Sequence, residues 1–134
     1  AKNTLDKHGI DSLVDIGGNG SLTGALLLEE EHGIKVIGIP GTIDNDLMIN
    51  DHTPGFPSAA KFVARAFAGI NQDNRALPGI YLGVVMGRHA GFLTAASSLA
   101  RQFDDDGPHL IYLPEKEFVV KDIKNKIIKI LLII

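Results

Sequence analysis

The stretch that decides the fold is Val36-Ile-Gly-Ile-Pro-Gly-Thr-Ile-Asp-Asn-Asp-Leu-Met-Ile49. It opens as an apolar run of strand type, and the run breaks at Pro40-Gly41. The loop that follows holds a hydroxyl, Thr42, and two carboxylates, Asp44 and Asp46. Because carboxylates this close repel each other, the loop needs a cation to bind or a proton to accept. We therefore expect this strand end to form an active-site edge in an open α/β sheet.

A glycine-rich turn lies one strand–helix unit earlier, in Leu13-Val-Asp-Ile-Gly-Gly-Asn-Gly-Ser-Leu-Thr-Gly24. It reads as a short strand, a turn, and a helix that starts at Ser21. Gly18 and Gly20 allow the backbone to approach a ligand closely. The free N–H groups at the start of the helix suit phosphate. A Gly-Gly-x-Gly turn alone is weak evidence, but its place before the acidic loop predicts an anion site.

A third strand end occurs in Ile80-Tyr-Leu-Gly-Val-Val-Met-Gly-Arg-His-Ala-Gly91. The strand ends at Gly87, and a guanidinium, Arg88, follows at once. Arginine at such a place can bind phosphate or a developing negative charge. Successive strand ends thus offer an anion cradle, a pair of acids and a cation, which together indicate phosphoryl transfer.

Strands and helices are expected to alternate along the chain, which favours an α/β fold: a three-layer sandwich with a mostly parallel sheet. The expected strands are residues 13–16, 36–39, 80–85 and 110–113, and the expected helices are residues 3–8, 22–32, 58–69 and 90–103. Residues 71–78 are expected to form a polar loop. Apolar residues at helical spacing from Val119 to Ile134 predict a final helix, with a strand in the last residues as the alternative.

The composition is that of an ordinary globular domain. The chain has 134 residues, 45% of them apolar and 22% charged, and a net charge of −3. Without a basic stripe, nucleic acid is not an expected partner. No apolar segment reaches the ~18 residues of a membrane span, so no membrane partner is expected. The absence of cysteine fits a cytoplasmic enzyme.

Three motifs, Gly-Gly-Asn-Gly-Ser, Pro-Gly-Thr-Ile-Asp-Asn-Asp and Met-Gly-Arg, resemble the phosphofructokinase family in their order and spacing. The similarity spans roughly Leu5 to Glu115. It implies transfer of a phosphoryl group to the 1-hydroxyl of fructose 6-phosphate, giving fructose 1,6-bisphosphate in glycolysis, with Mg²⁺ as cofactor. It also implies a cytoplasmic enzyme that forms a homo-oligomer at full length.

The resemblance assigns roles to residues of this chain. Asp44 matches the base that deprotonates the 1-hydroxyl, Thr42 contacts sugar or phosphoryl group, and Asp46 supports the catalytic charge arrangement. Arg88 matches a transition-state cation, and Met86 and Gly87 hold fructose 6-phosphate with it. The loop at the donor phosphates is matched by Gly18, Asn19, Gly20 and Ser21.

Two departures bear on the metal and the donor. Asn19 stands where the family usually has a metal-binding Asp, and its carbonyl oxygen can ligate Mg²⁺ without adding charge. Pyrophosphate enzymes tend to have Asp and Lys where this chain has Gly20 and Gly41, so both glycines favour ATP. The segments Asp51–Ser58 and Phe103–Glu115 are more similar to the pyrophosphate-using and related branches. Between the two donors, we expect ATP rather than pyrophosphate.

The family's fold begins with segments that have no match here, and the chain closes on five apolar residues, Ile130 to Ile134. We therefore expect residues 1–134 to be one partial phosphofructokinase-like domain, truncated at both ends, and inactive in isolation. Two alternatives stay open. One is a non-catalytic binding or assembly piece of such an enzyme. The other is a related Gly-Gly-x-Gly kinase that acts on NAD or lipid.

Overall fold

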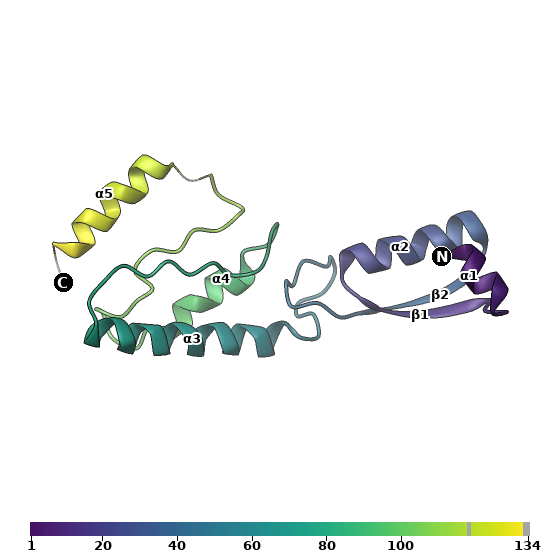
Figure 1. Cartoon of the computed structure of the whole chain (residues 1–134), viewed down its shortest axis with the longest axis horizontal. Coiled ribbons are helices and arrows are strands. Elements are labelled where there is room, and N and C mark those ends of the chain that lie inside the picture. The colour runs from purple at the N-terminus through teal and green to yellow at the C-terminus, as the bar shows by residue number, and fades with distance from the viewer. Residues whose placement is uncertain (118, 133–134) are drawn as a thin grey trace. The chain divides into compact units, whose positions relative to one another are not determined.

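The computed structural model describes residues 1–117 and 119–132 (Figure 1). The chain divides into two units, Ala1–Gly55 and Phe56–Ile134. Helices and strands follow in the order α1 Lys2–Lys7, β1 Ser12–Gly17, α2 Asn19–His32, β2 Lys35–Pro40, α3 Phe56–Ala76, α4 Phe92–Ala96, a 3₁₀ turn Ser97–Ala100, and α5 Val120–Leu131.

The first unit is built on a strand–helix–strand motif. β1 and β2 pair in parallel, in register from Ser12 opposite Lys35 to Gly17 opposite Pro40. The connecting helix α2 packs on both strands, and it ends at Gly33, whose φ of 66° is left-handed. The α/β class with a parallel sheet is thus confirmed, as are both strands and the end of this helix.

One face of the two-stranded sheet is covered by α2, and the opposite face is apolar. The side chains on that opposite face are exposed: Val14, Ile16, Ile37 and Ile39. Parallel strands usually have apolar residues on both faces because helices cover both. The sequence of these strands is therefore typical of a sheet that is covered by other elements on both faces.

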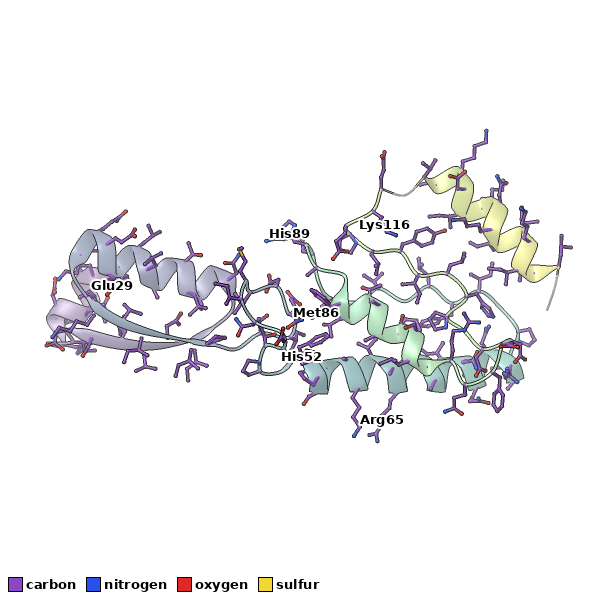
Figure 2. The ribbon with its side chains drawn as sticks, turned by 180° about the vertical axis from the view of Figure 1, so that it is seen from behind. Glu29, His52, Arg65, Met86, His89 and Lys116 are labelled. Atoms are coloured by element: carbon purple, nitrogen blue, oxygen red, sulfur yellow. The ribbon has the colours of Figure 1, made fainter. Side chains whose placement is uncertain are left out.

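The second unit is centred on α3, which packs against α4 and the 3₁₀ turn (Figure 1). Its core contains Leu93 and Ser97, each 2% exposed, and Ala100. Figure 2 shows Arg65 projecting from α3 on the side away from α4. α3 is longer than the predicted helix and continues to Ala76, so most of the expected polar loop at residues 71–78 is helical instead. Its polar side chains are used in the contacts described next.

A buried carboxylate joins α3 to the loop after the 3₁₀ turn. Asp106 is 3% exposed and accepts hydrogen bonds from the backbone N–H groups of Gln102 and Phe103, both at 2.9 Å. Asn71 and Arg75 of α3 donate to its other oxygen, at 2.6 and 2.9 Å. The two backbone donors, aided by these side chains, lower the pKa of Asp106 from 3.8 to about 2.

Two predicted strands are wrong. Residues 80–85 and 110–113 have no strand pairing in the part of the chain that the structure describes. Leu82 and Val84 are 86% and 93% exposed. A strand exists only where a neighbouring strand completes its hydrogen bonds. Among the described residues, neither 80–85 nor 110–113 has such a neighbour.

The expected helix at residues 90–103 is shorter in the structure, where α4 and the 3₁₀ turn span residues 92–100. The predicted final helix is confirmed as α5, while Ile134 lies outside the described residues. Of the helices in residues 1–117 and 119–132, none combines the length and apolar character that crossing a membrane requires.

Candidate functional site

The ends of the paired strands bring the glycine turn and the acidic loop together. The backbone N–H of Gly41, just after β2, donates to the carbonyl of Gly17, the last residue of β1, over 2.9 Å. A Cβ atom at Gly18 would lie 3.3 Å from the Cβ of Thr42. The predicted donor loop and the predicted catalytic loop are therefore in contact, as parallel pairing of their strands requires.

The glycines of the turn differ in what surrounds them. A Cβ at Gly17 would lie 2.6 Å from the Cβ of Ser21. The close approach of the first turn of α2 therefore favours glycine at position 17. Gly20 faces open space, since a Cβ placed on it would have no atom of the described residues within 4 Å beyond its own helix backbone. Asn19 begins α2, and its backbone carbonyl accepts a hydrogen bond from the Thr23 hydroxyl at 2.7 Å. This helix start, with a free space in front of Gly20, is suited to an anion.

The acidic loop holds one buried carboxylate oxygen that no described residue pairs with. The hydroxyl of Thr42 accepts a hydrogen bond from the backbone N–H of Asp44 at 3.2 Å. The Oδ1 atom of Asp44 is buried, and no described residue forms a hydrogen bond with it. Asp46, by contrast, is exposed. An unpaired buried carboxylate oxygen beside a hydroxyl can accept a proton or bind a cation.

The side chain of Asn45 holds this loop in place. Its Oδ1 accepts the backbone N–H of Thr53 at 2.8 Å, and its Nδ2 donates to the carbonyl of Asp51 at 3.2 Å. Thr53 is fully buried, and its hydroxyl donates to the carbonyl of Thr42 at 2.8 Å. Asn45 has a φ of 57°, a left-handed conformation that asparagine tolerates. These contacts fix the backbone on both sides of Asp44.

Sequence reasoning missed Thr53, and it also missed Asp15. The Oδ2 atom of Asp15 in β1 is buried and has no hydrogen-bond partner among the described residues. A carboxylate inside an otherwise apolar strand was the signal for Asp15. The role of Thr53 had no local signal, because its partners lie eight and eleven residues away.

The remaining predicted site residues belong to the second unit. Gly87 has a φ of 122°, in the region that favours glycine. Arg88 is exposed, and its Nε donates to Nε2 of His89 at 2.9 Å. Met86 is 68% exposed. Figure 2 labels Met86 and His89 on this segment. The structure thus presents two groups of predicted site residues, one in each unit.

The described residues contain no group of three His, Cys, Asp or Glu side chains that would by themselves hold a metal ion. Among the predicted site residues of the first unit, the oxygen donors include the side-chain carbonyl of Asn19 and the carboxylates of Asp44 and Asp46. Mg²⁺ commonly binds through one or two protein oxygens together with substrate phosphates. This donor set fits that mode of binding and does not provide a complete protein cage.

Comparison with known proteins gives one consistent family. The family model described as "Phosphofructokinase" matches residues 1–131. A pyrophosphate–fructose 6-phosphate 1-phosphotransferase of Rhodospirillum rubrum is 60% identical over 130 residues, which cover 90% of this chain and 32% of that enzyme. An ATP-dependent 6-phosphofructokinase of Thermoanaerobacter sp. strain X514 is 42% identical over 127 residues, covering 95% of this chain and 38% of that enzyme.

A solved structure agrees with these relatives. A pyrophosphate-dependent phosphofructokinase from Marinobacter aquaeolei superimposes with a TM-score of 0.73 and 32% sequence identity. The superposition covers 96% of this chain and 35% of that protein. The chain therefore spans about a third of the length of the relatives that it matches.

Proposed function

Because the chain belongs to the phosphofructokinase family, we propose that it provides the catalytic base and part of the donor site for phosphoryl transfer to fructose 6-phosphate. The observation that supports this best is the Oδ1 atom of Asp44 in the loop after β2, which is buried and has no hydrogen-bond partner among the residues that the structure describes. It lies in the loop that touches the glycine turn through Thr42 and Gly18. A base and a phosphate cradle on neighbouring strand ends are the two parts that such a transfer needs.

In the proposed reaction, Asp44 accepts the proton of the sugar's 1-hydroxyl as that oxygen attacks the terminal phosphorus of the donor. Thr42 contacts the sugar or the transferred group, and its hydroxyl also orients Asp44 by accepting the Asp44 backbone N–H. Asp46 adds negative charge at the mouth of the loop. Arg88, with Met86 and Gly87, binds the sugar phosphate and stabilises the charge that develops in the transition state.

The donor phosphates would lie on Gly18–Ser21 at the start of α2, where backbone N–H groups and the helix dipole favour anions. Mg²⁺, when bound, would neutralise charge on the phosphate oxygens. Asn19 is the residue that would hold it in this chain. The full-length enzyme is proposed to be cytoplasmic and homo-oligomeric.

We propose ATP as the donor because the position of Gly20 faces open space, which leaves room for a nucleotide. Gly41 contributes less to this argument, since a Cβ there would already lie 3.3 Å from the Cγ2 of Ile16. The 60% identical relative is named for pyrophosphate, whereas several relatives near 42% identity are named for ATP.

The test uses a hybrid enzyme in which these 134 residues replace the matching segment of the Rhodospirillum rubrum enzyme. Formation of fructose 1,6-bisphosphate is measured with ATP and with pyrophosphate, and the unaltered relative is the positive control. We expect transfer with at least one donor. A folded hybrid that transfers to fructose 6-phosphate from neither donor would contradict the proposal and favour a non-catalytic role.

A further inference from the structure

A glutamate outside the predicted site holds the end of the segment that carries Arg88. The backbone N–H of Gly91 donates to the Oε1 atom of Glu115 over 2.6 Å, across 24 residues of sequence. Gly91 is buried. A Cβ on it would come within 2.6 Å of Oε2 of Glu115 and 3.0 Å of Leu113. The glutamate thus lies directly against the glycine backbone, and a side chain at this position would displace its carboxylate.

The loop from Gly87 to Gly91 is fixed at both ends. At its start, a Cβ on Gly87 would overlap the carbonyl oxygen of Ala90, so the backbone folds back on itself. Ala90 is 6% exposed, and the loop then enters α4 at Gly91. Between these ends lie Arg88 and His89, which are exposed. Figure 2 labels His89, which precedes Gly91 by two residues, and Lys116, which directly follows Glu115.

We propose that Glu115 is a positioning residue for Arg88. Its carboxylate acts through the Gly91 backbone and needs no contact with substrate. A hydrogen bond to an ionised acceptor is roughly twice as strong as a neutral one, which suits a contact that fixes a short loop. Transition-state stabilisation by a guanidinium depends on its placement before the reaction begins. This inference rests on the proposed function, because it takes Arg88 as part of the site.

The kinetic test is made in the hybrid enzyme. Glu115→Ala should lower turnover by about tenfold, the loss expected for one hydrogen bond to a charged group, with the KM for the phosphoryl donor unchanged. Glu115→Gln keeps an oxygen acceptor and should recover turnover to within about threefold of the parent. Glu117→Ala, at an exposed glutamate of the same loop, is the matched control and should have no effect.

A double-mutant cycle separates positioning from a general structural role. If Glu115 acts through Arg88, Glu115→Ala should cost little further turnover once Arg88→Ala is present. Equal losses in both backgrounds would overturn the proposal. So would a Glu115→Gln variant that is as slow as Glu115→Ala, because the hydrogen bond would then not be what matters.

Amide hydrogen exchange at Gly91 in the 134-residue chain tests the contact independently of activity. We expect exchange at least about tenfold faster in Glu115→Ala than in the parent, and near-parental exchange in Glu115→Gln. Unchanged exchange in Glu115→Ala would overturn the role of Glu115 alone. A hybrid without transfer activity would instead overturn the proposed function, and with it the role given to Arg88.

Discussion

The Oδ1 atom of Asn45 accepts a hydrogen bond from the backbone N–H of Thr53 at 2.8 Å, and this contact anchors the backbone next to Asp44. Both partners are buried, with 8% of Asn45 and none of Thr53 exposed. The backbone at Asp44 is therefore held in place by the side chain of the next residue, Asn45. The middle residue of the Asp-Asn-Asp motif organises the loop, and the acids on either side are left for chemistry.

Asn45→Ala should destabilise the chain by about 2–3 kcal/mol, because buried donors lose their partner and alanine disfavours positive φ. Asn45→Gly loses the same hydrogen bonds without the φ penalty, so it should be less destabilising by about 1 kcal/mol. Urea unfolding measures both. Asn50→Ala, at an exposed asparagine of the same loop, is the control. Equal stability of Asn45→Ala and the parent would contradict this account of the loop.

Asp44→Asn in the hybrid should lower turnover by roughly 10²–10⁴-fold, the usual range for a lost general base. The fold should persist, since the side chains have the same shape. Asp46→Asn is the matched control at an exposed carboxylate and should lose less. Steady-state rates and circular dichroism make the comparison. Near-parental turnover in Asp44→Asn would show that another group takes the proton.

Asn19→Asp adds a carboxylate at the start of α2, where negative charge and a Mg²⁺ ligand are both favourable. The Mg²⁺ concentration that gives half-maximal rate in the hybrid should fall, by about threefold or more. Asn19→Ala should raise it. If neither change alters the Mg²⁺ dependence, Asn19 does not contact the metal.

Gly20→Asp should shift donor preference from ATP toward pyrophosphate, because it fills the open space beside the turn with a charged group. The ratio of kcat/KM values for the two donors should change by about tenfold or more. Two hybrids, in the Rhodospirillum rubrum and Thermoanaerobacter enzymes, separate this segment from its surroundings. If the donor follows the host enzyme in both hybrids, the glycine does not determine it.

Acid should weaken the second unit through Asp106. Its pKa is about 2 in the folded chain against 3.8 ordinarily, so the unfolded chain takes up the proton first. The contribution of ionised Asp106 to the free energy of unfolding is then complete above about pH 4 and is lost as the pH falls toward about 2. Asp106→Asn should lower the urea midpoint near neutral pH, and the gap from the parent should close in acid.

The matched control for this pH dependence is Asp105→Asn. Asp105 also pairs with Arg75, but 67% of its side chain is exposed, and exposed ion pairs contribute little. A gap between the parent and Asp106→Asn that stays constant down to about pH 2 would contradict the lowered pKa.

Local patterns were sufficient for the two paired strands of the first unit and for the end of its helix. Apolar runs ending in glycine or Pro-Gly predicted β1 and β2, and Gly33 marked the end of α2. Because parallel strands place their carboxyl ends together, the contact between Gly18 and Thr42 followed from the same patterns. The family could also be recognised from short motifs, since the phosphate and acid loops are each contiguous in sequence.

Sequence alone determined that this is an α/β chain of the phosphofructokinase family and which loops follow its two paired strands. Only the tertiary structure decided which apolar runs pair as strands, since residues 80–85 have the pattern but pair with no strand in the described part of the chain. It also decided that Thr53 fixes the acidic loop and that Glu115 reaches Gly91. The physical reason is distance along the chain: periodicity reports what a residue's neighbours in sequence favour, whereas hydrogen bonds between distant residues depend on how the backbone has already folded.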